Sequence, residues 1–149
     1  MEPKTISLDE ANRMLPLLRQ IVGDIMSSWE KIIEKRTELE CAERGIRSDG
    51  QGTQPRDPLI VQQLKVELNY LIDKINHYIR EVEALGCFVE EFKRGIVNFP
   101  SLFNGRRVFL CWGPDEKSVR YWHEIDETYA DRVEIRNERE FMVTNPHVR

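Results

Sequence analysis

Apolar residues recur at alternating steps of three and four from Leu8 to Leu39, the a/d spacing of a helix that packs along one seam. The seam positions, one of them polar, are Leu8, Ala11, Leu15, Leu18, Val22, Ile25, Trp29, Ile32, Arg36 and Leu39. Ser7 and Glu10 stand at the spacing of a capping box, which satisfies free amides at a helix start. We therefore predict a first helix over residues 7–43.

A second seam follows after a glycine-rich interruption. Asp57-Pro58 combines an N-cap acceptor with a proline at the first helical position, and Gly86 suits the end of the helix. The seam between them consists of Val61, Leu64, Leu68, Leu71, Ile75, Tyr78, Val82 and Leu85. This pattern predicts a helix over 58–85, joined to the first by a mobile loop over 44–57. Two matched seams favour an antiparallel coiled-coil hairpin.

Beyond Gly86 the apolar residues fall into short runs that are typical of strands. The runs are Cys87–Val89, Gly95–Phe99, Arg107–Trp112 and Val119–His123. Asn104-Gly105 is a strong hairpin-turn signal because both residues tolerate positive φ. We predict a three- to four-stranded antiparallel β-meander over 87–123, followed by a C-terminal segment and tail over 124–149. The chain is then one α+β domain, residues 1–149.

The predicted register of the last two strands depends on the length of their connection. A loop over 113–118 places Leu110 opposite Tyr121 and Val108 opposite His123, with Trp122 on the other face beside Phe109. Both faces then carry apolar residues, whereas antiparallel sheets often leave one face to water. The helices can cover one face. The other must meet a partner, a second protomer or the segment after His123.

Composition and charge narrow the class of protein. The 149 residues are 40% hydrophobic and 32% charged, as in a globular protein with much solvated helix surface. The net charge of −4 argues against nucleic acid as the main partner. The three cysteines form no CxxC pair, which indicates buried thiols in a reducing compartment. With no secretory signal and no apolar run of membrane-spanning length, we expect a cytoplasmic protein without a membrane partner.

The densest polar cluster lies around His123. His123, Asp126 and Glu127 can supply nitrogen and oxygen ligands to a divalent metal, or His123 can shuttle protons while Asp126 orients it. The competing interpretation is structural: His123 ends a strand and hydrogen-bonds a neighbouring oxygen. Cys111 as a nucleophile is disfavoured because the predicted register turns it away from His123. No cofactor is predicted, although a divalent metal is possible.

Several segments together resemble an uncharacterised bacterial family, domain of unknown function 2203. They are Ile6–Asn12, Leu15–Leu18, Leu85–Cys87, Gly95–Pro100, Gly105–Trp112 and Tyr121–Glu124. The resemblance covers about Ile6 to Arg132 and implies a prokaryotic, cytoplasmic protein with a helical hairpin and a small sheet, but it supplies no reaction. It also implies that aspartate usually stands at the position of Asn98, and that Arg132 matches a family arginine suited to an anion or another ligand.

The leading functional hypothesis from the sequence is a non-enzymatic interaction or scaffold protein. The hairpin would provide an arm or self-association surface, and an aromatic sheet face of Phe109, Tyr121 and Trp122 would contact a protein partner or a second copy. The alternative is a small-ligand or divalent-metal protein, possibly an enzyme, with its site around His123 and Asp126.

Overall fold

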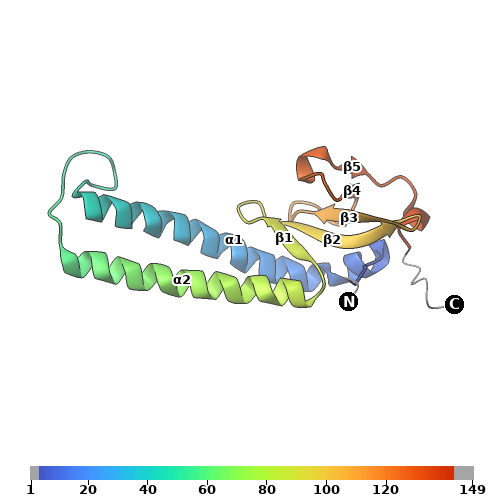
Figure 1. Ribbon diagram of the computed structural model, residues 1–149, viewed down its shortest axis with the longest axis horizontal. Helices are drawn as coiled ribbons and strands as arrows, with labels where there is room; N and C mark the ends of the chain where they lie inside the picture. Colours follow the sequence, from blue (N-terminus) through green and yellow to red (C-terminus); the bar gives the residue numbers. More distant parts are fainter. Residues whose placement is uncertain (1–3, 143–149) are drawn as a thin grey trace.

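The computed structural model describes residues 4–142, and the last part of the predicted C-terminal tail lies outside them. Two long helices form a hairpin, and a sheet lies over one end of it (Figure 1). The connection between the helices is at the opposite end of the hairpin (Figure 1). The α+β architecture predicted from the sequence is confirmed.

The helices are α1 (Leu8–Arg44) and α2 (Pro58–Ala84), of 37 and 27 residues. At 1.5 Å per residue they are about 55 and 40 Å long. The predicted caps are present: Ser7 and Glu10 form a capping box, and the side chain of Asp57 accepts the amide hydrogen of Leu59. Among the described residues, neither helix is apolar enough over a sufficient length to cross a membrane.

The seam of α1 differs from the prediction in its second half. Ser28 is buried and Arg36 is exposed, and Lys35 lies on the α2 side, where it forms an ion pair with Glu67 at 2.9 Å. Trp29 turns away from the seam and packs against Phe92, with the ring centroids 5.4 Å apart. At both positions the more buried residue is one earlier than predicted, whereas Ile32 between them is buried as predicted.

The segment predicted as a mobile loop forms a small hairpin. Gly45 ends α1 in a left-handed conformation, and Ile46 and Thr53 form an antiparallel bridge. The amide of Gln54 donates to the carbonyl of Gly45 at 2.9 Å, which closes the two sides together. The mobility of this segment stays a prediction, but backbone hydrogen bonds from Arg47 to Gly52 and from Gly50 to Arg47 give it a defined shape.

The sheet contains five antiparallel strands in sequence order, two of them very short. They are β1 (Phe88–Glu91), β2 (Ile96–Phe103), β3 (Arg106–Trp112), β4 (Tyr121–His123) and β5 (Val133–Glu134). The predicted meander is confirmed, and β5 extends it beyond the three to four strands expected. Asn104 and Gly105 turn between β2 and β3 with positive φ angles of 48° and 87°.

The predicted register of β3 and β4 is wrong by one residue. His123 pairs with Phe109 and Trp122 with Leu110, so every β4 side chain lies on the face opposite to the prediction. The cause is a longer connection, since β4 begins at Tyr121. The amide of Val119 donates to the side-chain oxygen of Asn12 in α1 at 2.7 Å, and so the chain is held to the helix before the strand begins.

The core lies between the helices and one face of the sheet, which we call the inner face. Its central sheet residues are Val97, Phe99, Val108, Leu110 and Trp112. They pack in one cluster with the apolar seam residues of α1 and α2. Gly95 allows the β1–β2 turn to approach α1 closely, because an added Cβ would lie 2.5 Å from a methyl carbon of Val22. The half of the hairpin that lies next to the sheet therefore covers the inner face.

Candidate functional site

The second face of the sheet, the outer face, carries most of the polar side chains that the sequence marked as candidates. Strand pairing places Asn98, Cys111 and Tyr121 side by side on it, with His123 two residues further along β4. Residues 124–132, which we call the cover, lie over this face and include the 3-10 helix η1 (Tyr129–Asp131). Of the three covers that the sequence left open, the structure shows the segment after His123.

His123 is 1% exposed and both of its ring nitrogens have oxygen neighbours. Nδ1 lies 2.8 Å from the carbonyl oxygen of Glu124, and Nε2 lies 3.2 Å from Oδ1 of Asn98 and 3.4 Å from Oε1 of Glu90. The Asn98 amide nitrogen donates to the same Glu90 oxygen at 2.7 Å. The second Glu90 oxygen accepts the backbone amide of Tyr129 at 2.9 Å. Through these contacts His123, Asn98 and Glu90 connect three strands, β4, β2 and β1, to the cover.

The ligand set predicted for a metal is not brought together. Asp126 and Glu127 are exposed, and Glu127 accepts the backbone amide of Glu124 at 2.9 Å. The His123 ring faces the opposite way, toward β1 and β2. Within residues 4–142, no three His, Cys, Asp or Glu side chains are grouped as metal ligands would be. The geometry matches the structural interpretation of His123, extended by the partly buried carboxylate of Glu90.

Arg132, the candidate anion site, already has an anionic partner. Its guanidinium donates two hydrogen bonds to the carboxylate of Glu116, one of them at 3.1 Å, and lies 4.1 Å from the ring centroid of Tyr121. Desolvation lowers the pKa of Arg132, but the hydrogen bonds and charge of Glu116 outweigh it and raise the pKa overall. A ligand anion would have to displace Glu116 from a bidentate pair, a strong form of carboxylate contact.

Cys111 lies on the same face as His123, which removes the register argument against a catalytic pair. The thiol is nevertheless fully buried, and this desolvation raises its pKa to about 12 even though Arg132 favours the thiolate. Nη1 of Arg132 is 4.0 Å from the sulfur. Because the thiolate is the reactive form, the residue is a protonated packing thiol in this fold.

The predicted aromatic interaction face is divided between the two faces of the sheet. Trp122 belongs to the inner face, where it stacks on Phe103 with centroids 4.8 Å apart and also contacts Phe141 of η2 (Glu138–Phe141). Phe109 lies on the outer face, edge-on to Phe88 at 5.2 Å. Tyr121 is also on the outer face, under Arg132. The three aromatic residues are half-buried by contacts within the chain, so they do not form one open surface.

The hairpin carries an exposed apolar surface that the sequence reasoning missed. Leu59, Val66 and Tyr70 of α2 are 80%, 57% and 65% exposed. Together with Gln63 they are spaced at alternating steps of four and three residues. This spacing places them in one stripe on the side of α2 that is turned away from its seam. We call Leu59, Gln62, Gln63, Val66, Asn69 and Tyr70 the outward face of α2. A search for a second stripe offset from the dominant seam would have found it.

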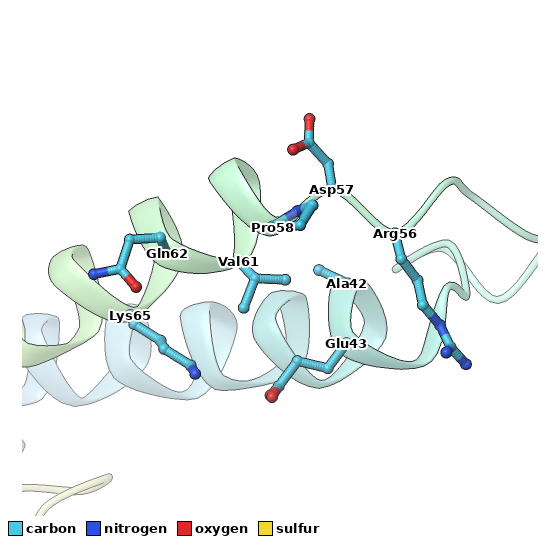
Figure 2. A pocket seen from close by; sticks show the side chains of 8 residues that line it. All are labelled: Ala42, Glu43, Arg56, Asp57, Pro58, Val61, Gln62 and Lys65. Carbon is cyan, nitrogen blue, oxygen red and sulfur yellow. The ribbon is translucent and has the colours of Figure 1, made fainter.

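A hollow of about 410 Å³ opens at the end of the hairpin. Its lining residues are Ala42, Glu43, Arg56, Asp57, Pro58, Val61, Gln62 and Lys65. Figure 2 shows Ala42 and Val61 in the middle of this group, with charged side chains around them. Two cations and two anions line it, so its charge favours neither an anionic nor a cationic ligand.

A family model described as an uncharacterized conserved protein, DUF2203, matches residues 4–135. The chain belongs to this family. Comparison with curated proteins and with solved structures gave no match. The DUF2203 match confirms the resemblance seen in the sequence segments. It covers both helices, all five strands and the cover.

Proposed function

We propose that this DUF2203 member is a non-enzymatic, cytoplasmic protein-interaction or scaffold protein whose helical hairpin is the binding arm. Another protein or a second copy of the chain docks on the outward face of α2. The sheet anchors the arm, because its apolar residues are already covered by the helices on one side and by residues 124–132 on the other.

The observation that carries this proposal is the absence of charge from the outward face, which spans the first turns of α2 before Asp73. All six positions of the outward face are uncharged, in a chain in which 32% of residues are charged. Three of the six are apolar or aromatic and more than half exposed. The cores of protein interfaces are depleted in charged residues, and tyrosine is enriched among the residues that dominate binding energy. A merely solvated helix face would instead carry lysine and glutamate.

The same face argues for a protein rather than a nucleic acid. Nucleic-acid binding relies on lysine and arginine placed along the phosphate backbone. The outward face offers amide and apolar side chains and no cation. Glutamine and asparagine can hydrogen-bond across a protein interface, and Tyr70 combines an apolar ring with a hydroxyl group, as interface tyrosines do.

A photo-cross-linking amino acid at position 66 tests the proposal in living cells. We expect one discrete adduct, with either a second copy or one other protein, identified by mass spectrometry. The matched control is position 125, because Ile125 is 54% exposed but lies in the cover, away from the hairpin. Absence of a discrete adduct from position 66, or the same products from both positions, would contradict the assignment of the binding arm.

A further inference from the structure

The hydrogen bonds around His123 require one more proton than a neutral ring and an ionised Glu90 provide. A backbone carbonyl only accepts, so Nδ1 must donate to Glu124. Nε2 then faces the Asn98 amide oxygen and a Glu90 carboxylate oxygen, which are both acceptors. A neutral imidazole with its hydrogen on Nδ1 would place a lone pair against these two oxygens.

Rotating the Asn98 amide does not remove the conflict. If the Asn98 amide nitrogen faced Nε2, the amide oxygen would take its place 2.7 Å from Oε1 of Glu90. Two oxygens at that distance repel each other unless one carries a hydrogen. That arrangement needs a hydrogen on Glu90 instead. Imidazole is the stronger base of the two, with an ordinary pKa of about 6.5 against about 4.3 for glutamate. The extra proton therefore belongs on the ring.

We propose that His123 is an imidazolium ion that latches the cover onto the outer face of the sheet. Both ring N–H groups donate, one to the first residue of the cover and one to the Glu90–Asn98 pair. Glu90 completes the latch by accepting the amide of Tyr129, further along the cover. Loss of the ring proton turns an attractive contact at Nε2 into a repulsive one, so the cover opens as pH rises.

The charged and titratable groups around the ring support this direction. Glu90 on β1 is the nearest anion, at 3.4 Å, and the Glu124 carboxylate is paired with Arg106 at 2.8 Å. On β3, Cys111 stays neutral because burial raises its pKa to about 12. Arg132, beyond Cys111, is neutralised by Glu116. Among the described residues, Glu90 is therefore the counter-ion of the ring. Opening would uncover Tyr121, which lies under Arg132, and give the sheet a second, pH-controlled contact surface.

Nitrogen-15 NMR of the histidine side chains tests the latch directly in the full chain. We expect His123 to show two protonated ring nitrogens at pH 7, as its hydrogen-bond geometry requires. When His123 loses its proton, hydrogen-exchange protection of the Tyr129 amide should fall about tenfold, while that of Leu110 in the core stays constant. A neutral His123 at pH 7 would overturn the proposal. So would hydrogen-exchange protection of the Tyr129 amide that stays the same when His123 loses its proton.

Two variants separate the latch from a passive structural role. Glu90→Gln removes the counter-ion, and we expect the doubly protonated signature of His123 to disappear at pH 7. The neighbouring Glu91→Gln is the matched control, because Glu91 pairs with the exposed Arg94 at 3.5 Å and should leave the signature unchanged. Asn98→Asp adds a second carboxylate at Nε2 and should extend protonation to higher pH. An unchanged His123 spectrum in both Glu90→Gln and Asn98→Asp would contradict the latch.

Discussion

The sheet has both of its faces covered by its own chain, whereas the distal hairpin, residues 33–72, consists of two helices that share a single seam. In the sheet, Phe99, Leu110 and Trp112 are completely buried against the helices, and residues 124–132 cover the other side. In the distal hairpin, Ala42 and Leu64 are among the few buried apolar residues, while Leu59 and Tyr70 are exposed.

The two regions also treat polar groups differently. The sheet buries His123 and Asn98 but gives each a hydrogen-bond partner, as buried polar groups require. The distal hairpin leaves its amide side chains in water, and its inter-helix ion pair, Lys35 with Glu67, is partly exposed. The Glu67 hydrogen bond raises the pKa of Lys35, but an exposed pair of this kind is screened by salt. The comparison shows a sheet covered on both faces by its own chain and a hairpin that leaves apolar side chains exposed.

Truncating one core residue in each region should lower the free energy of unfolding by unequal amounts. Phe99→Ala leaves a closed cavity under the sheet and should lower the free energy of unfolding by about 3–5 kcal/mol. Leu64→Ala lies in the two-helix seam, where water can enter from either side, and should cost about 2 kcal/mol. Urea unfolding followed by circular dichroism measures both. Equal losses would show that the distal seam is as enclosed as the sheet core.

Removing the ring of His123 should have the next largest effect. His123→Ala leaves the Glu90 carboxylate without its cation, and breaking a buried pair in this way costs about 3 kcal/mol when the carboxylate keeps some contact with water. His77→Ala is the control on the arm, where the imidazole is exposed and 3.0 Å from Glu81. In thermal unfolding at pH 7, the unfolding temperature of His77→Ala should be close to that of wild type. A His123→Ala protein as stable as His77→Ala would contradict the proposed ion pair between His123 and Glu90.

The helices and their ends were predictable because their signals are local. The three–four spacing, the Ser7–Glu10 box and the Asp57-Pro58 start act within a few residues of the structure they specify. The register of β4 was not, since it depends on the hydrogen bond from Val119 to Asn12, residues 107 apart in the chain. The same holds for Trp29, which packs against Phe92, a residue far along the chain, while Ser28 beside it is buried.

The candidate site was found in part, for the same reason. His123 was singled out as a residue with chemical potential, but its expected partners, Asp126 and Glu127, were simply its neighbours in sequence. The actual partners, Glu90 and Asn98, lie on β1 and β2 and meet the ring only when the sheet forms. Because of the one-residue error in register, Cys111 and His123 were predicted on opposite faces of the sheet. Trp122 and Phe109 were predicted on the same face.

The smallest expected effect concerns the buried thiols at alkaline pH. Burial raises the pKa of both Cys87 and Cys111 to about 12, from an ordinary value of 9.0 in the unfolded chain. Their protonated state therefore stabilises the fold fully below pH 9, and this contribution is lost as pH rises through 9 toward 12, because the unfolded chain releases the protons first. At pH 10 each thiol should lower the free energy of unfolding by about 1.4 kcal/mol.

Cys111→Ala removes the pH-dependent contribution of one buried thiol. Between pH 8 and pH 10 the free energy of unfolding of this variant should therefore fall by about 1.4 kcal/mol less than that of wild type. Cys41→Ala is measured beside it, because Cys41 is a half-exposed thiol on the distal hairpin and its removal changes the thiol count equally. Urea unfolding at the two pH values gives all three differences. If Cys111→Ala and Cys41→Ala lose the same stability as wild type over this range, the sheet does not hold its thiol in the neutral form, and burial by the cover is weaker than the contacts of Arg132 and Tyr121 indicate.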